Sequence, residues 1–252
     1  MSTSPLTSRR TLVALATYNE IDNIPTLVAE LLNALPHANV LIIDDNSPDG
    51  TGRYAQELAT REPRVQALVR ENERGLGSAV LRAFQFAIES DYDYLVNMDA
   101  DFSHSVSDVP RLLSKLIESE ETDEPLDVVV GSRYVPGGST PDWSLKRRLM
   151  SRSINVFARI TLGLKTHDNS GSFRCYRVSK LRALSIDSFV STGYSFFEET
   201  LYRLKQEGAQ FAEIPIVFLD RRFGASKING REAVKAVWIM LKLGLARLVR
   251  RN

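Results

Sequence analysis

Two aspartates separated by one residue follow an apolar run that has the composition of a buried strand. The run is "YLVNM" (94–98), and Asp99 and Asp101 come directly after it. If the strand continues through them, both side chains lie on one face, because strand side chains alternate with a period of two. Two close carboxylates repel each other unless a cation lies between them. The pair therefore predicts a site for a divalent metal ion.

Two further polar clusters follow apolar runs in the same way. "TYNE" (17–20) follows "TLVALA" (11–16), and "DDNSPDGTG" (44–52) begins where "VLIID" (40–44) ends. In open sheets of parallel strands, ligands bind beyond the carboxyl ends of the strands. A nucleotide beside Mg²⁺ or Mn²⁺ would use such carboxylates for its ribose, its base and the metal that bridges its diphosphate. A bare acidic pair, taken alone, is more often a surface turn or a helix cap.

The chain lacks two common signatures of phosphate binding. It contains no GxxxxGK[ST] loop, and "RGLGSA" (74–79) is not a GxGxxG motif after the first strand. These absences disfavour P-loop hydrolases and nicotinamide dehydrogenases.

Strands and helices must alternate to position the clusters at one edge. Apolar runs predict strands at 11–16, 40–44, 65–69, 94–99 and 127–131. Apolar residues at spacings of three and four predict helices within 24–35 and 109–117. We therefore expect an α/β fold with a mostly parallel central sheet flanked by helices.

The pattern changes after residue 132. A turn-rich loop, "VPGGSTPDW" (135–143), precedes a basic, partly apolar segment at 144–164. A strand at 172–177, a helix at Phe196–Gln206, an apolar run at 211–219 and a helix from about 231 complete the chain.

Length and composition are those of an ordinary globular protein. The 252 residues, 43% hydrophobic and 25% charged, suffice for one large domain with a sizeable core. The single cysteine, Cys175, excludes an internal disulfide and favours a reducing, cytosol-facing setting. The N-terminus lacks the apolar core of a signal peptide, and no run of about 18 apolar residues occurs. We therefore expect no transmembrane helix.

The charges are distributed unevenly. Residues 1–130 contain 10 Lys and Arg against 22 Asp and Glu, a net charge of −12, whereas residues 131–252 contain 22 against 9, a net charge of +13. The basic half is expected to face an anionic partner such as phosphates, nucleic acid or a lipid surface.

The motifs resemble those of one enzyme family. "TYNE", "IIDDNSPDGTG", "RGLGSA", "MDADFSH", "GSRY", "LKRRLMSR", "GSFRCYR", "GYSF" and "FLDRRFGASK" occur in this order. The order is similar to that of the dolichyl-phosphate (polyprenyl-phosphate) mannose synthases of glycosyltransferase family two, over about residues 11–245. The resemblance implies a GT-A type nucleotide-sugar-binding fold, GDP-mannose as donor, a polyprenyl or dolichyl phosphate as acceptor, and Mg²⁺ or Mn²⁺.

The resemblance also implies a division of the chain. Residues 1–10 would be a flexible N-terminus, and 11–230 the GT-A glycosyltransferase domain, including a basic acceptor or interface helix at 144–164. Residues 231–252 would form a C-terminal amphipathic helix.

The same resemblance assigns three groups of site residues. The nucleotide group consists of Ala16, Tyr18, Glu20, Ile43, Asp45, Asp99, Ala100, Asp101, Arg133, Arg221 and Lys227. The metal group consists of Asp99, Asp101 and Ser103, and the acceptor-phosphate group of Arg133, Arg147 and Ser151. The expected catalytic residues are Asp99, Asp101, Arg133, Arg147, Arg221 and Lys227. Ala16 departs from the family, in which a proline normally precedes the Thr-Tyr-Asn-Glu run.

Some of these residues have ordinary alternative roles. Ser103 could cap a helix that begins near Ser105, and Lys146–Arg148 could be a hydrated helix face. His104 either orders the metal loop or is a structural histidine. Asp168 is expected to position the basic loop.

The acceptor chemistry follows from the charge of a phosphate. A phosphate monoester is already anionic at neutral pH, so it attacks the anomeric carbon without a general base. The enzyme must then supply cations, and the segment 146–159 contains five basic residues and no acidic one. Glu198 and Glu199 are accordingly expected to orient arginines or metal ligands rather than to act as bases.

Two basic amphipathic segments, 143–164 and 231–252, have the composition of helices that lie on a membrane surface. In the alternative, Val234, Val237, Leu241 and Leu245 simply pack on the core. We expect a peripheral protein at the cytoplasmic face of a membrane, with access to lipid through these helices or a small membrane subunit, and no nucleic-acid partner.

The sequence thus predicts an inverting transfer of mannose from GDP-mannose to a polyprenyl phosphate. One alternative keeps the reaction but uses another donor of the UDP-glucose type. Another is a non-catalytic membrane adaptor that retains the fold.

Overall fold

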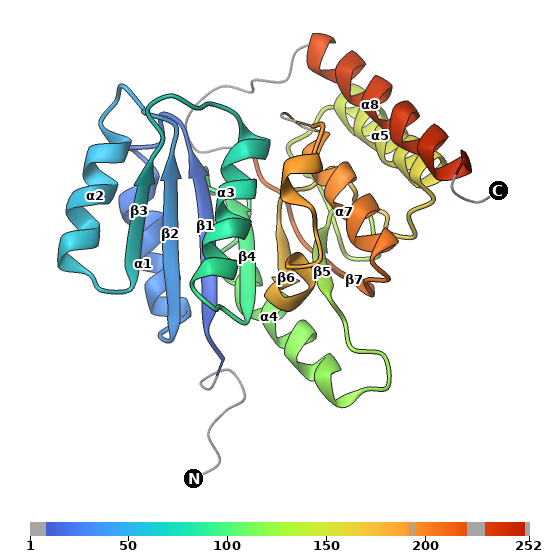
Figure 1. Cartoon of the computed structure of the whole chain (residues 1–252). Helices are drawn as coiled ribbons and strands as arrows, with labels where there is room; N and C mark the ends of the chain where they lie inside the picture. Colours follow the sequence, from blue (N-terminus) through green and yellow to red (C-terminus); the bar gives the residue numbers. More distant parts are fainter. Residues whose placement is uncertain (1–8, 192, 194, 221–229, 250–252) are drawn as a thin grey trace.

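One mixed sheet runs through the centre of the molecule (Figure 1). The computed structural model describes residues 9–191, 193, 195–220 and 230–249. Within these residues the sheet has seven strands in the order β3-β2-β1-β4-β6-β5-β7. The strands are β1 (Thr11–Thr17), β2 (Ala38–Asp44), β3 (Val65–Val69), β4 (Tyr94–Asp99), β5 (Val128–Ser132), β6 (Arg174–Arg177) and β7 (Phe211–Pro215).

Most strand pairs are parallel, which confirms the predicted α/β fold. The pairs of β1 with β2 and β4, of β2 with β3 and of β5 with β7 are parallel, whereas β6 runs antiparallel to β4 and β5. β7 is shorter than the apolar run at 211–219. Ile216 N still donates to Ser132 O at the end of β5 (3.0 Å), but farther on Phe218 N donates to Ser139 O (2.9 Å) and Leu219 N to Ser103 O (3.1 Å).

The helices include four that the sequence patterns predicted. The structure has α1 (Ile24–Ala34), α2 (Thr51–Arg61), α3 (Leu76–Glu89), α4 (Asp108–Glu118), α5 (Leu145–Leu162), α6 (Val178–Leu181), α7 (Phe196–Gln206) and α8 (Gly230–Val249), with short 3₁₀ turns η2 (Ser119–Glu121) and η3 (Ile186–Ser188). The predicted helices correspond to α1, α4, α7 and α8, and the basic segment forms α5. The sequence analysis missed α2, α3 and the short α6. α2 buries only Thr51, Gly52 and Ala55, so its apolar period is weak.

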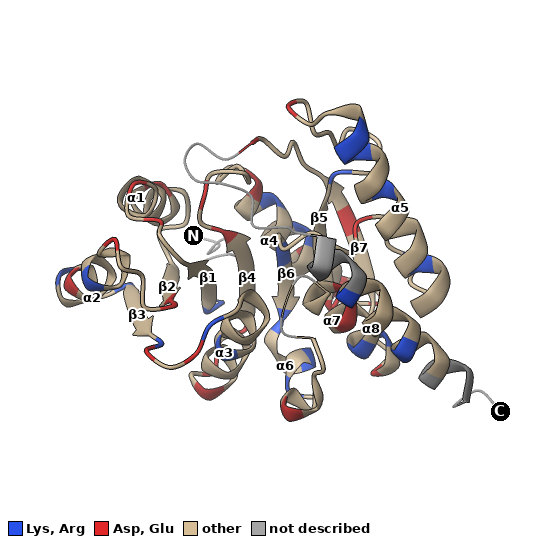
Figure 2. Ribbon diagram, turned by 90° about the horizontal axis from the view of Figure 1, so that it is seen from above, with Lys and Arg blue, Asp and Glu red and all other residues tan. Residues whose placement is uncertain are grey.

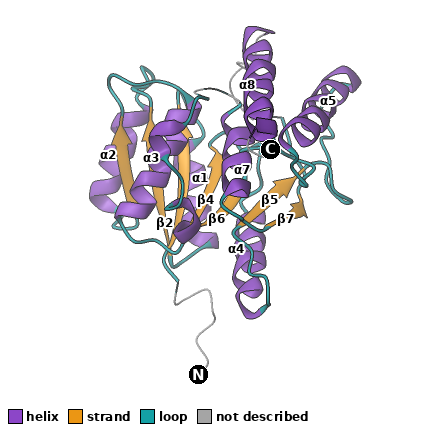
Figure 3. Cartoon of the chain, turned by 45° about the vertical axis from the view of Figure 1, so that its right-hand side comes forward, coloured by secondary structure: helices purple, strands orange, loops and turns teal. Residues whose placement is uncertain are grey.

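The helices cover both faces of the sheet (Figure 3). One core contains side chains of α1, α2 and α4, and the other contains side chains of α3, α5, α6, α7 and α8. The strands between these cores are almost entirely apolar and buried, as expected for parallel strands covered on both sides. Cys175 lies in the core as a free thiol.

Helices α5 and α8 lie side by side at the end of the sheet that contains β5 and β7 (Figures 1 and 3). They approach closely at Gly244, where a Cβ atom would lie 2.5 Å from Cγ2 of Thr161. α8 buries Ala236 and Met240, but Leu241 and Leu245 are 45% and 64% exposed. Val237 is partly buried and packs against the core, and the side chain of Val234 lies outside the described residues. The alternative is therefore confirmed for Val237 and wrong for the two leucines.

Candidate active site

The carboxyl ends of β1, β2 and β4 meet at one edge of the sheet. In the strand register, Ala16 lies opposite Ile43 on one side and Asp99 on the other, and Thr17 lies opposite Asp44. The three polar clusters therefore converge as the sequence predicted, because each begins where one of these strands ends.

Asp44 organises the loop that follows β2. Its carboxylate accepts hydrogen bonds from Thr17 Oγ1 (2.9 Å), Ser47 N (2.8 Å) and Ser47 Oγ (2.6 Å). A Cβ atom at Gly52 would lie 2.7 Å from Asp44 Oδ2. Only a glycine lets the first turn of α2 approach this carboxylate so closely.

Asp45, expected to contact the nucleotide, is paired with an arginine that the sequence analysis did not identify. Arg70 donates to Asp45 Oδ1 from Nε (2.8 Å) and from Nη2, and Gly75 N donates to Oδ2 (2.8 Å). Asp45 is 8% exposed. Its carboxylate thus fastens the loop between β3 and α3 to the end of β2. The nucleotide contact stays a prediction.

Tyr18 and Arg74 bring an aromatic face and a cation together at the same edge. The guanidinium carbon of Arg74 lies 5.1 Å from the centre of the Tyr18 ring. Nearby, Glu20 accepts a hydrogen bond from Asn23 Nδ2 (2.8 Å), and its backbone N donates to Thr51 Oγ1 (3.0 Å). A planar base could stack against either the ring or the guanidinium.

The acidic loop after β4 differs from the expected geometry. β4 ends at Asp99, so strand alternation does not extend to Asp101, and the prediction that it places both carboxylates on one face is wrong. The chain instead turns through Phe102, which has a φ of 60°. Asp101 is 4% exposed and accepts a hydrogen bond from Ser103 N (3.0 Å), with Ala100 buried beside it.

Ser103 is a suitable oxygen ligand for a cation. Its side chain is fully buried, and its Oγ has no hydrogen-bond partner among the described residues. The capping alternative is excluded, because α4 begins at Asp108 and its N-cap residue is Ser107. Within the described part of the chain, no group of three or more His, Cys, Asp or Glu side chains could hold a metal ion. The unpartnered Ser103 Oγ, next to the carboxylate of Asp101, would suit a cation whose remaining ligands come from another source, such as diphosphate oxygens. The assignment of Asp99, Asp101 and Ser103 to a metal stays a prediction.

His104 lies beneath the acidic loop and contributes to its order. It is 2% exposed, and its Nε2 lies 3.5 Å from Asp99 Oδ2 and 3.2 Å from Ser172 Oγ. Its ring stacks on Phe173 at 4.7 Å between centres. The position fits both interpretations of this histidine, since it is packed in the structure and also contacts Asp99.

Arg133 is held by a buried carboxylate at the same edge. Asp168 accepts hydrogen bonds from Nε and Nη2 of Arg133, each at 2.7 Å, and from its backbone N at 3.0 Å. Burial alone would lower the pKa of Arg133, but the attraction of Asp168, with smaller contributions from Tyr134 and Asp99, raises it overall. The prediction that Asp168 positions the basic loop is confirmed. Glu213, which the sequence analysis did not single out, fixes Asp168 in turn, accepting a hydrogen bond from its backbone N (2.9 Å).

The other two predicted acceptor residues have partners in the structure. Arg147 donates to Asp220 Oδ1 (2.8 Å) and stacks on Trp143, with its guanidinium carbon 4.0 Å from the ring centre. Ser151 Oγ accepts a hydrogen bond from the hydroxyl of Tyr134 (2.5 Å). Arg221 and Lys227 lie outside the described residues.

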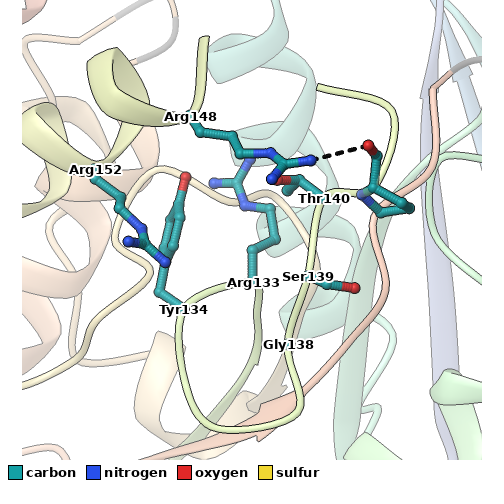
Figure 4. A pocket seen from close by; sticks show the side chains of 8 residues that line it. Arg133, Tyr134, Gly138, Ser139, Thr140, Arg148 and Arg152 are labelled. Carbon is teal, nitrogen blue, oxygen red and sulfur yellow. Dashed lines mark hydrogen bonds between the residues drawn. The ribbon is translucent and has the colours of Figure 1, made fainter. Parts of the chain in front are cut away.

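A pocket of about 250 Å³ lies beside Arg133, between the loop after β5 and the first two turns of α5 (Figure 4). Its lining residues are Arg133, Tyr134, Gly138, Ser139, Thr140, Pro141, Arg148 and Arg152. None of them is acidic, and α5 itself contains no Asp or Glu (Figure 2). The pocket is therefore suited to an anion.

The two glutamates at the start of α7 are both buried, and Glu199 has an arginine partner. Glu199 is fully buried and accepts hydrogen bonds from Val190 N, Ser191 N and Arg203. Glu198 is 2% exposed, and its burial raises the pKa to about 7, against the opposing effect of Arg174. Glu199 orients an arginine, as predicted. The pKa of Glu198 also responds to the charges of Arg174, Asp168 and Arg133.

Comparison with known proteins assigns the chain to a sequence family. Residues 12–185 match the sequence model of glycosyl transferase family 2. Undecaprenyl-phosphate mannosyltransferase of Micrococcus luteus is 39% identical over 237 residues, which cover 94% of this chain and 95% of that protein. Polyprenol monophosphomannose synthase of Mycolicibacterium smegmatis is 37% identical over 239 residues, which cover 94% of this chain and 88% of that protein. The resemblance to polyprenyl-phosphate mannose synthases is thereby confirmed.

Solved structures confirm the GT-A type fold. Glucosyl-3-phosphoglycerate synthase from Mycobacterium tuberculosis, in complex with Mn²⁺, UDP-glucose and phosphoglyceric acid, superposes with a TM-score of 0.63 at 17% identity, covering 96% of this chain and 82% of that one. Its complex with Mn²⁺, UDP and glucosyl-3-phosphoglycerate superposes with a TM-score of 0.61 at 16% identity, covering 97% of this chain and 84% of that one. At this identity the likeness concerns the fold alone.

Proposed function

This chain belongs to glycosyl transferase family 2, and from that premise we propose that it transfers mannose from GDP-mannose to a polyprenyl phosphate. The products are polyprenyl-phosphate mannose and GDP. The names of the two relatives, which cover nearly the whole chain, support the sugar and the acceptor class. The observation that supports the chemistry best is the position of the buried Arg133 and the acidic loop at one sheet edge, close enough for Asp99 to influence the pKa of Arg133.

On the donor side, Asp99, Asp101 and Ser103 would hold Mg²⁺ or Mn²⁺. When bound, the ion supplies positive charge against the diphosphate that departs from the sugar. Arg133 adds a fixed cation there, and its bonds to Asp168 orient its guanidinium before substrate binds. The sequence resemblance adds Arg221 and Lys227 to this group. Tyr18, Glu20, Ile43 and Asp45, with Ala16 and Ala100, would surround the nucleotide.

On the acceptor side, the reaction needs cations rather than a base. The phosphate oxygen of the acceptor attacks the anomeric carbon from the face opposite the diphosphate, which inverts the configuration. Arg133, Arg147 and Ser151 would hold that phosphate. Arg147 must exchange its ion pair with Asp220 for one with the substrate. The ion pair with Asp220 holds the Arg147 side chain until the acceptor binds.

A membrane surface is the expected location of the acceptor. α5 exposes Leu145, Leu149, Met150, Val156 and Ile160, and α8 exposes Trp238, Leu241 and Leu245. The helices described in the structure include none long and apolar enough to cross a membrane. We propose that the paired helices α5 and α8 lie in the headgroup region, with their cations drawn to anionic lipid. The contact would be at the cytoplasmic face, with or without a small membrane subunit.

An in vitro assay that crosses donors with one acceptor tests the reaction. GDP-mannose, GDP-glucose, UDP-glucose and UDP-galactose are each incubated with a short-chain polyprenyl phosphate and Mn²⁺. We expect transfer of mannose from GDP-mannose, and faster transfer from UDP-glucose would overturn the donor assignment. No transfer from any donor, together with no metal-dependent nucleotide binding by calorimetry, would favour the adaptor alternative.

A further inference from the structure

Two arginines in the pocket beside Arg133 have no carboxylate partner among the residues that the structure describes. Arg148 and Arg152 lie one turn apart on α5, and both side chains point toward the pocket (Figure 4). Arg148 donates one hydrogen bond, to the carbonyl oxygen of Pro141 (2.9 Å). Arg152 forms no ion pair or hydrogen bond with the described residues, and its guanidinium carbon lies 6.0 Å from the centre of the Tyr134 ring.

The neighbouring cations are different in this respect. Arg133 is neutralised by Asp168, and Arg147 by Asp220. The excess positive charge of the pocket therefore comes from Arg148 and Arg152. A guanidinium presents several N–H donors in a plane, and an anion that satisfies them forms stronger bonds than a neutral acceptor does.

The remaining lining of the pocket suits an oxyanion. Ser139 and Thr140 supply hydroxyl groups, and no lining residue is acidic. The hydroxyl of Tyr134 already donates to Ser151 Oγ. The volume of about 250 Å³ is several times the roughly 30 Å³ that a water molecule occupies in the liquid. The pocket that the two arginines line therefore has room for a phosphate group.

We propose that Arg148 and Arg152 bind a phosphate group in this pocket, in addition to the acceptor residues predicted from sequence. Its source, which rests on the proposed function, is either the phosphate of the polyprenyl acceptor or the headgroup of an anionic lipid beside it. The first would make the two arginines acceptor ligands. The second would make them membrane ligands next to the acceptor site.

A binding measurement tests the proposal without activity. The chain has two tryptophans, and Trp238 is 64% exposed, so Trp238→Phe makes the buried Trp143 the single reporter. Trp143 stacks on Arg147 and lies 5.3 Å from the guanidinium carbon of Arg133, so an anion bound nearby should change its fluorescence. Inorganic phosphate and a short-chain polyprenyl phosphate are titrated separately.

In this background we expect R148Q/R152Q to weaken binding of both ligands at least tenfold. Arg61→Gln, on α2 at the other end of the sheet, is the control for loss of an arginine, and Arg152→Lys should restore part of the affinity. Affinities within twofold of the control would overturn the proposal. This outcome is distinguishable from failure of the proposed function, because phosphate binding is measured whether or not mannose is transferred.

Two further measurements distinguish the sources of the phosphate. In neutral detergent, a raised acceptor KM with an unchanged donor KM in R148Q/R152Q identifies the acceptor phosphate. An unchanged acceptor KM in detergent, together with at least tenfold weaker binding to vesicles containing phosphatidylglycerol, identifies a lipid headgroup. If neither quantity differs from that of Arg61→Gln, the proposal is wrong.

Discussion

Asp168 grips the guanidinium of Arg133 with both carboxylate oxygens, at 2.7 Å from Nε to Oδ2 and 2.7 Å from Nη2 to Oδ1. The carboxylate is fully buried, and the Arg133 side chain is 8% exposed. The two residues are 35 positions apart in the sequence, one after β5 and the other before β6. The pair therefore connects two loops of the candidate active site and fixes the direction of the cation.

Asp168→Asn should destabilise the protein and reduce transfer. The amide keeps the shape of the side chain but leaves the buried Arg133 without a counter-charge, a change that costs about 3–5 kcal/mol in other proteins. Urea unfolding measures the stability, and initial rates of mannose transfer measure the function. Asp123→Asn, in an exposed loop, is the matched control. A loss below about 1 kcal/mol would show that the pair does not order this site.

Asp101→Ala should abolish transfer. Asp101 is the buried member of the acidic pair, and a lost contact of about 1.4 kcal/mol already reduces a rate tenfold. Activity within about tenfold of wild type would reject its role at the metal. Calorimetry of GDP binding with Mn²⁺, with and without EDTA, gives a second readout, since the variant should lose the metal-dependent part of the affinity and Asp123→Ala should not.

The strands were predictable from sequence because their signal is local. A run of buried apolar residues is visible without knowledge of its neighbours, and so is the polar cluster at the end of each strand. The same holds for the apolar stripe of α4. By contrast, α2 is mostly polar, and the two-residue alternation that suggested the geometry of Asp99 and Asp101 ends with β4.

The partners of the site residues were not predictable in this way. Arg70 lies 25 residues from Asp45, and Glu213 lies 45 residues from Asp168. Arg70 directly follows β3, and Glu213 lies within β7. Neither residue is part of a recognised motif, and only the order of strands in the sheet brings each one to its partner. The antiparallel direction of β6 is equally invisible in "RCYR", since four residues contain no information on chain direction.

Glu198→Gln should remove one source of pH dependence from the stability. The pKa of Glu198 is about 7 in the folded protein against an ordinary value of 4.5, with burial as the main cause and Arg174, Asp168 and Arg133 as the facing charges. Folding therefore binds a proton between these pH values. The stability from this group is fully present below about pH 4.5, falls as the pH rises to about 7, and is constant above that.

Urea unfolding at pH 5, 6, 7 and 8 checks this expectation. The free energy of unfolding of Glu198→Gln, relative to wild type, should increase with pH up to about 7, by an amount on the order of 3 kcal/mol. Glu207→Gln, exposed just after the same helix, should follow the wild-type curve. Parallel curves for Glu198→Gln and wild type would mean that Glu198 has no raised pKa.

Gly244→Ala should separate α8 from α5. The new Cβ atom would lie 2.5 Å from Cγ2 and 3.0 Å from the carbonyl oxygen of Thr161, and real Cβ contacts are not that short. Overpacking of this kind costs about 1–3 kcal/mol. Because the exposed leucines of α8 and the apolar residues of α5 form the proposed membrane surface together, the variant should also bind anionic vesicles more weakly.

The double variant Gly244→Ala with Thr161→Ser tests whether the clash with Thr161 causes the losses expected for Gly244→Ala. Serine lacks Cγ2, the nearest clashing atom, but keeps the hydroxyl group of Thr161. Stability and vesicle binding should therefore recover part of the loss, while Thr161→Ser alone should have a smaller effect than Gly244→Ala. The carbonyl oxygen of Thr161 is unchanged, so full recovery is not expected. If Gly244→Ala alone matches wild type in both measurements, the two helices do not act as one surface.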